Sequence, residues 1–139
     1  MNTKPMLEQS DVQALLMGAR GEAEKNGWKV SIAVVDDGGH LLGLMRLDGT
    51  PPSTARMADE KARTAALTRR ESKVYEDMIN GGRYAFLSAP LVATLEGALP
   101  ILTNGECVGA VGVSGVKSDQ DAEIAKAAIA YLNRTSGGL

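Results

Sequence analysis

The stretch "WKVSIAVVDDGGHLLGLMRL", residues 28–47, decides the fold. Its first half is rich in β-branched residues, which predicts a strand over residues 28–36 that ends at Asp36. The glycines in residues 37–39 then turn the chain, and residues 40–47 return as a second strand. The sequence therefore predicts an antiparallel hairpin whose return strand starts at His40, the only histidine of the chain.

A second hairpin is predicted near the C-terminal end. The segments "ALPILT" and "ECVGAVGVS" are separated by Asn104 and Gly105, a pair that is typical of a type I′ turn. Gly109 and Gly112 fall inside the second of these strands, whereas a dinucleotide-binding loop needs its glycines between a strand and a helix. They indicate instead a close approach to the sheet by a helix, another subunit or a flat ligand.

Helical patterns surround the two hairpins. Ser10 in "SDVQ" has the spacing of a capping box and predicts a helix from there to about residue 26. Further helices are predicted over residues 53–68 and 72–80 and from residue 118 onward. This order of elements predicts one α+β domain over residues 1–139, with an antiparallel sheet and the helices segregated to one side of it.

Composition narrows the functional classes. The 139 residues are 44% hydrophobic, with 15 basic and 17 acidic side chains and a net charge of −2. Because the chain has no strong positive field and only one tryptophan, three tyrosines and one phenylalanine, we expect no nucleic-acid partner. We expect a cytoplasmic protein, because the chain has a single cysteine and its first residues are charged. We expect no membrane partner, because the chain has no apolar run of about 20 residues.

Lys61 is a candidate functional residue on the helix predicted over 53–68. Its neighbours three and four positions away are uncharged, and most of them are small. Such a lysine either extends past the alanines to solvent or meets an anion that lies off the helix. The candidate anions are Asp36 and Asp48 at the ends of the first hairpin, or the carboxylate of a ligand.

The first hairpin carries the other candidates. Arg46 and Asp48 are two residues apart, and Arg46 is suited to clamp a carboxylate because a guanidinium donates two parallel hydrogen bonds. The pair can equally bind each other. His40 is either a solvated turn residue or a functional group. One histidine and one cysteine predict no metal site made of several protein ligands, although a single axial ligand to haem needs only one residue.

Four segments together resemble the GlcG/HbpS family, also called the haem-degrading HbpS-like domain. They are "VSIAVVDDGGHLLGLMRLDG", "ADEKARTAA", "GALPILTNGECVGAVGVSG" and "DQDAEIAKAAI", and in this order they cover nearly the whole chain. The resemblance implies a profilin-like α+β fold with an antiparallel sheet of about five strands flanked by helices. It also implies a homo-oligomer, and haem as a cofactor for some members.

The family pattern also implies site residues. Arg46 and Asp48 fall in the motif that usually reads "RMDG", here with Leu47 in place of methionine, and Lys61 matches the lysine of "KA-x-TA". Gly97 falls in the loop that usually reads "GGxPI", but this chain reads "EGALPI" with Glu96 before a single glycine. Glu96 therefore places a carboxylate where the family often has only backbone.

Two functions remain open at the level of the sequence. The first is binding or degradation of haem. The second is catabolic chemistry on an organic acid by a lyase, isomerase or hydrolase. In this hypothesis Arg46 and Lys61 hold the carboxylate of the substrate, and Asp48 and Gly97 also bind the ligand. Glu96 or His40 then moves a proton. A role as an accessory protein of glycolate or diol catabolism, without chemistry of its own, is a further alternative.

Overall fold

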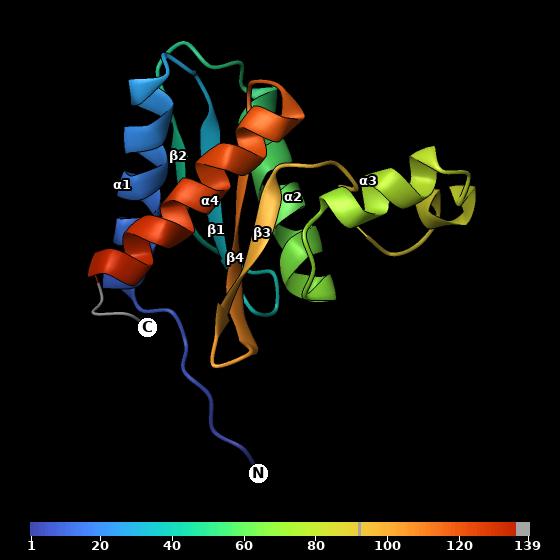
Figure 1. Ribbon diagram of the computed structural model, residues 1–139, viewed down its shortest axis with the longest axis horizontal. Coiled ribbons are helices and arrows are strands. Elements are labelled where there is room, and N and C mark those ends of the chain that lie inside the picture. The colour runs from blue at the N-terminus through green and yellow to red at the C-terminus, as the bar shows by residue number, and fades with distance from the viewer. Residues whose placement is uncertain (92, 136–139) are drawn as a thin grey trace.

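The computed structural model describes residues 1–91 and 93–135. Within these residues the chain forms the following elements: α1 (Gln9–Lys25), β1 (Ser31–Asp36), β2 (Leu41–Arg46), α2 (Ser53–Thr68), α3 (Lys73–Asn80), the 3₁₀ helix η1 (Tyr84–Leu87), β3 (Ala98–Thr103), β4 (Glu106–Ser114) and α4 (Ser118–Thr135). Figure 1 shows α1 and α4 side by side in front of the sheet, while α3 and the turn after it project away from the body of the molecule.

The described residues form one antiparallel sheet of four strands in the order β2-β1-β4-β3. The α+β class and both hairpins are confirmed. The expectation of about five strands is wrong by one. The described part of the connection between α3 and β3 forms the 3₁₀ helix and turns instead of a strand.

Local chemistry explains both hairpins. In the first, the Asp36 carboxylate accepts hydrogen bonds from the backbone N–H groups of Gly38 and His40, each at 2.9 Å, and so closes the turn. In the second, Asn104 and Gly105 have φ angles of 53° and 80°. Two successive positive φ values define the type I′ turn that the sequence predicts.

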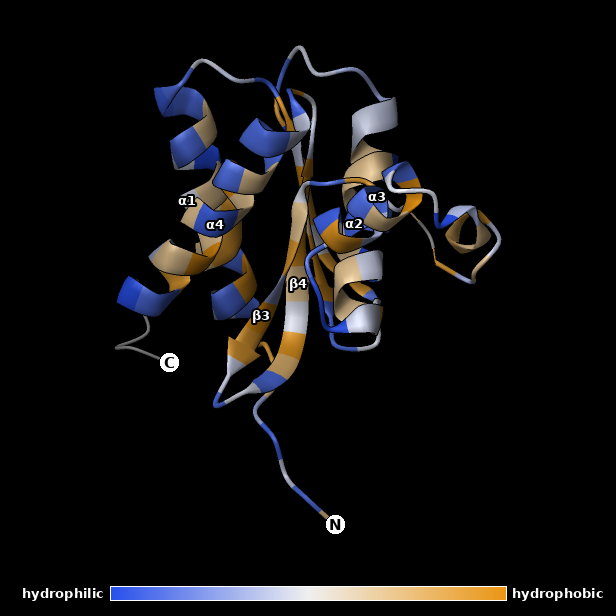
Figure 2. Ribbon diagram, turned by 45° about the vertical axis from the view of Figure 1, so that its right-hand side comes forward, coloured by the Kyte–Doolittle hydropathy of each residue, from blue (hydrophilic) through white to orange (hydrophobic). Residues whose placement is uncertain are grey.

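Helices cover both faces of the sheet, which corrects the expectation that they lie on one side. In Figure 2, α1 and α4 pack on one face and α2 packs on the other. The α1/α4 face holds a core of larger side chains that includes Leu15, Ile32 and Val113, whereas the α2 face is built almost entirely from alanines. The small side chains let α2 lie very close to the sheet, which explains Gly112: a Cβ there would lie 2.3 Å from the Ala58 carbonyl oxygen.

The N-terminus of α1 differs from the prediction. The helix begins at Gln9 with Glu8 as its N-cap, so Ser10 lies inside the first turn and does not cap it. The backbone N–H of Glu8 donates to the Asp11 carboxylate at 2.8 Å. Glu8 and Asp11 thus form the capping box of this helix, as its N-cap and N3 residues. The prediction placed the box two residues too late, at Ser10 and Gln13.

Candidate functional site

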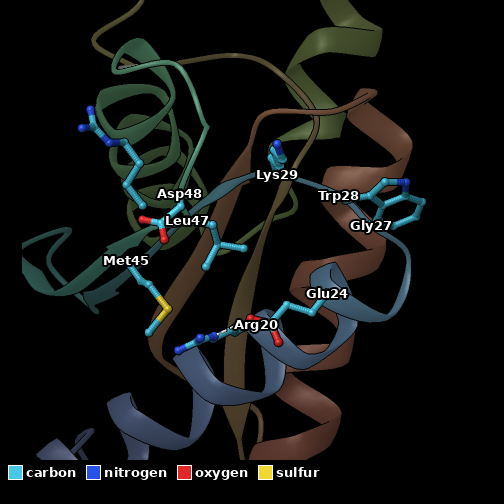
Figure 3. Close-up of a pocket in the computed structure, with 9 residues that line it drawn as sticks. Arg20, Glu24, Gly27, Trp28, Lys29, Met45, Leu47 and Asp48 are labelled. Atoms are coloured by element: carbon cyan, nitrogen blue, oxygen red, sulfur yellow. Dashed lines mark hydrogen bonds and ion pairs between the residues drawn. The ribbon is translucent and has the colours of Figure 1, made fainter.

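An open groove of about 490 Å³ lies between α1 and the end of β2. It is lined by Arg20, Glu24, Gly27, Trp28, Lys29, Met45, Arg46, Leu47 and Asp48. In Figure 3 the Leu47 side chain lies between the Arg20–Glu24 pair on α1 and the turn that carries Asp48. The volume is in the range of small-molecule sites.

Backbone hydrogen bonds hold the turn after β2 in place. The Leu47 N–H donates to the Val30 carbonyl oxygen at 3.0 Å, and the Thr50 N–H donates to the Leu47 carbonyl oxygen at 3.2 Å. Gly49 has a φ of 82°, and a Cβ at this position would lie 3.1 Å from the Lys29 Nζ. The glycine therefore allows the turn and also leaves room for the Lys29 side chain to lie across it.

The groove combines paired and unpaired charges. Arg20 donates to the Glu24 carboxylate at 2.7 Å, and this hydrogen bond is the main cause of the raised pKa of Arg20, with a smaller contribution from the charge of Asp48. Among the described residues, neither Lys29 nor Asp48 makes a side-chain hydrogen bond or an ion pair. The groove thus offers Lys29 as a free cation and Asp48 as a free hydrogen-bond acceptor, with the Lys29 side chain lying against the turn that carries Asp48.

The structure brings Arg46 and Asp48 to the same groove, as their spacing suggests, but they do not pair with each other. Arg46 is opposite Ser31, whose hydroxyl is 2.8 Å from the Thr54 hydroxyl on α2. Directly opposite residues of an antiparallel pair point to the same face. The Arg46 side chain therefore leaves β2 on the α2 face of the sheet, and it also lines the groove.

Among the groove residues that the sequence analysis did not single out, three carry side-chain hydrogen-bond donors: Arg20, Trp28 and Lys29. A signal for two of them was present. Trp28 and Lys29 directly precede the first strand of the hairpin, and Arg46 to Asp48 end the second strand. Because antiparallel pairing places the start of one strand beside the end of the next, these residues had to lie close together.

Lys61 is part of a buried ion pair and lines none of the cavities described here. Its ammonium group donates to the Asp121 carboxylate and to the Val113 carbonyl oxygen, each at 3.1 Å. The side chains of Lys61 and Asp121 are only 4% and 2% exposed. The anion that faces Lys61 is therefore Asp121 of α4, which corrects the expectation of Asp36 or Asp48.

Asp121 joins three elements around this pair. Its second carboxylate oxygen accepts the Val116 N–H at 3.2 Å, in the turn before α4. Burial raises the pKa of Asp121 to about 6, although the charge of Lys61 opposes the shift. Gly97 makes room for the pair, because a Cβ there would lie 2.9 Å from the Lys61 Nζ. Gly97 accordingly has a structural task in this fold.

Glu96 lies away from the groove. It lines a separate hollow of about 120 Å³ together with Gly97, Lys73 and Lys126. The pKa of Lys73 is raised mainly by its hydrogen bond to Asp77, with a smaller contribution from Glu96. The structure therefore does not place Glu96 in one pocket with Arg46 or Lys61, as proton transfer to a substrate held by those cations would require.

His40 lies on the β1–β2 turn, with its side chain 81% exposed. Its Nδ1 is 3.2 Å from the Asp36 carboxylate oxygen that also closes the turn. It lines neither the groove nor the hollow at Glu96. The sequence-predicted site residues thus lie in three regions: the groove, this turn, and the buried Lys61–Asp121 pair with the adjoining Glu96 hollow, which meet at Gly97.

No group of three or more His, Cys, Asp or Glu side chains in residues 1–91 and 93–135 is arranged to hold a metal ion. Within the same residues, no helix combines the length and apolar character of a membrane span.

The chain resembles known proteins in both sequence and structure. The family model described as "Haem degrading protein HbpS-like" matches residues 7–130. Protein GlcG of Escherichia coli K12 is 54% identical over 114 residues, which are 82% of this chain and 85% of that protein.

Two solved structures share the fold. A double mutant of Streptomyces reticuli HbpS has a TM-score of 0.85 and 30% identity, with 94% of this chain and 89% of that one covered. The PduOC:heme complex has a TM-score of 0.83 and 26% identity, with 93% and 96% covered.

Proposed function

The chain belongs to the HbpS-like family, and on that premise we propose that it binds haem on the β1–β2 turn, with His40 as the ligand of the iron. Support comes from a structural relative that was solved as a haem complex and from the description of the family model. The observation that carries the proposal is the contact between His40 Nδ1 and the Asp36 carboxylate.

This contact prepares a histidine for metal ligation. A carboxylate that accepts the Nδ1–H proton fixes the imidazole tautomer and leaves Nε2 with a free lone pair. Asp36 is itself held by the N–H groups of Gly38 and His40, so the carboxylate has a fixed position. The exposure of His40 leaves the ring accessible to a large flat ligand.

An apolar surface for the porphyrin begins at the next residue. Leu41, Leu42 and Leu44 on β2 and Leu67 on α2 are between 43% and 48% exposed. Leu41 and Leu44 are opposite Val35 and Ala33, which belong to the α2-side core, so both face the side of the sheet on which Leu67 lies. The side chains of Leu41, Leu44 and Leu67 are called the leucine surface below.

A cation for the haem propionates lies beside the leucine surface. Gly39 lies against the side chains of Arg63 and Leu67, since a Cβ there would lie 3.5 Å from a carbon of each. Arg63 is therefore adjacent to the turn and suited to bind a carboxylate. When bound, haem supplies an iron centre that exchanges electrons or binds oxygen, and the role of these residues is to hold and orient it.

We expect His40→Ala to abolish the sharp Soret shift that haemin gives with the wild-type protein at one haem per site. Added imidazole should restore part of the shift, because it replaces the missing ligand. Absorbance titration measures both effects. An unchanged Soret band in His40→Ala would remove His40 from the site. Loss of the band with time under ascorbate and air would extend the function from binding to degradation of haem.

The leucine surface provides a second arm of the same experiment. Leu44→Ser should weaken haem binding, while Leu102→Ser serves as the matched control because Leu102 is equally apolar and 54% exposed at the far hairpin. Equal haem affinity of the two variants would contradict the proposed surface.

We also propose that the protein is a homo-oligomer. In the described sheet β2 is an edge strand, and an unpaired edge with exposed leucines favours association. Next to Leu44 and Arg63, one buried carboxylate oxygen of Asp59 has no hydrogen-bond partner in the described structure. Light scattering should return a mass of at least twice 14.6 kDa at micromolar concentration, and a monomer mass would contradict this proposal.

A further inference from the structure

We propose that the groove between α1 and the end of β2 binds a small carboxylic acid that carries a hydrogen-bond donor, a hydroxyl or an ammonium group, next to its carboxylate. This site is independent of the haem proposal, because β2 presents the two sites on opposite faces. Leu44 is opposite Ala33 of the α2-side core, whereas Met45 is opposite Ile32 of the α1/α4 core and lines the groove.

The groove holds a cation that the fold positions but does not use. Lys29 lies across Gly49, where the absence of a side chain leaves it room, and it makes no ion pair among the described residues. The neighbouring Arg20 is already bound to Glu24 at 2.7 Å. Lys29 is therefore available for the carboxylate of a ligand, and Arg46, which also lines the groove and makes no ion pair among the described residues, is a second cation there.

Asp48 supplies the complementary function. It is adjacent in sequence to Gly49, against which the Lys29 ammonium lies, yet the two charged groups do not come within ion-pair distance. A carboxylate only accepts hydrogen bonds. A ligand that satisfies both groups must present an anion to Lys29 and a donor to Asp48.

The apolar side chains limit the rest of the ligand. Trp28, Met45 and Leu47 are half-buried and line the groove. The indole N–H of Trp28 makes no hydrogen bond with the described residues. With an open volume of about 490 Å³, a short carbon skeleton fits between these side chains.

The single tryptophan makes the groove directly observable. Because Trp28 is the only tryptophan, fluorescence excited selectively in tryptophan, beyond the absorption of the three tyrosines, reports on this site. We expect lactate or alanine to give a saturable change in the haem-free protein, and acetate to bind about tenfold more weakly because it lacks the donor. Comparison of lactate with alanine tells which donor the site prefers. Sodium chloride at equal ionic strength controls for screening.

Two variants with matched controls test the assigned roles. Lys29→Met should abolish the response to all three acids, whereas Lys25→Met, which removes an exposed lysine outside the groove, should not. Asp48→Ala should remove the tenfold advantage over acetate, whereas Glu123→Ala, which removes an exposed carboxylate of α4, should retain it. Near-ultraviolet circular dichroism checks that each variant is folded.

Three results would overturn the inference. These are a titration of Lys29→Met that coincides with that of the wild type, equal affinity for acetate, lactate and alanine, and no saturable response to any acid up to about 100 mM, far above the Kd of a working site. His40→Ala should bind the acids normally, so failure of haem binding and failure of acid binding are separate outcomes.

Discussion

Replacing Lys61 with methionine is expected to lower the free energy of unfolding by about 3–5 kcal/mol near neutral pH. The substitution keeps a long apolar stem in the space between α2 and α4 but leaves the Asp121 carboxylate buried without its cation. An uncompensated buried charge costs far more than an exposed one. Urea denaturation of the wild type and the variant measures the difference.

The pH dependence identifies the charge as the cause. The pKa of Asp121 is raised from 3.8 to about 6, so the folded protein holds this proton more tightly than the unfolded chain does. The contribution of Asp121 to stability is therefore greatest below about pH 4 and is lost as the pH rises through about 6. In Lys61→Met the pKa of Asp121 rises further, because the opposing charge of Lys61 is gone.

The deficit of Lys61→Met should accordingly shrink as the pH falls from about 7.5 to about 5, where the orphaned carboxyl takes up a proton. Arg56→Met is the matched control on the same helix. Arg56 is 85% exposed and pairs with Glu60 at 3.0 Å, so its loss should cost less than about 1 kcal/mol at either pH. A Lys61→Met deficit that is equally small, or identical at both pH values, would contradict a structural ion pair.

Gly112→Ala is expected to destabilise the fold by about 3 kcal/mol, at the upper end of the usual cost of overpacking. The new methyl group would lie 2.3 Å from the Ala58 carbonyl oxygen and 2.7 Å from the Ala62 backbone nitrogen. Both atoms belong to the backbone of α2, so the clash is relieved only if the whole helix moves away from the sheet. Thermal or urea unfolding measures the loss.

Gly21→Ala is the control for this substitution. Gly21 lies inside α1, and nothing comes within 4 Å of a Cβ built there. The same chemical change should stabilise the protein by about 0.5–1 kcal/mol, because alanine loses less conformational freedom than glycine in a helix. Opposite signs for the two variants would confirm the close approach of α2, whereas a Gly112→Ala variant as stable as the wild type would contradict it.

Local signals predicted most of the elements. Asp36 and the glycines after it, and Asn104 with Gly105, determine their turns through the conformations that these residues adopt within a few positions of the chain. The same is true of the joint position of Arg46 and Asp48 on the groove, which follows from two residues at the end of one strand. The motifs spread along the chain also predicted the family.

The tertiary structure decided which residues and elements contact each other. The sequence left open whether Gly112 accommodates a helix, a subunit or a ligand, and the structure shows α2. It also left the anion for Lys61 open, and the structure places Asp121 there, 60 positions away. Likewise, α1 and α4 pack on one face of the sheet and α2 packs on the other, although the order of the elements suggested that all helices lie on one side.

The physical reason is the range of the interactions involved. Turn geometry and periodicity depend on neighbouring residues. The turns at Asp36 and at Asn104 and Gly105 can therefore be predicted from the sequence alone. The partner of Lys61 and the isolation of Glu96 from the groove depend on how helices pack across a sheet, and packing is set by the whole core at once. A buried lysine must find a carboxylate, but only the packed fold decides that the carboxylate is Asp121.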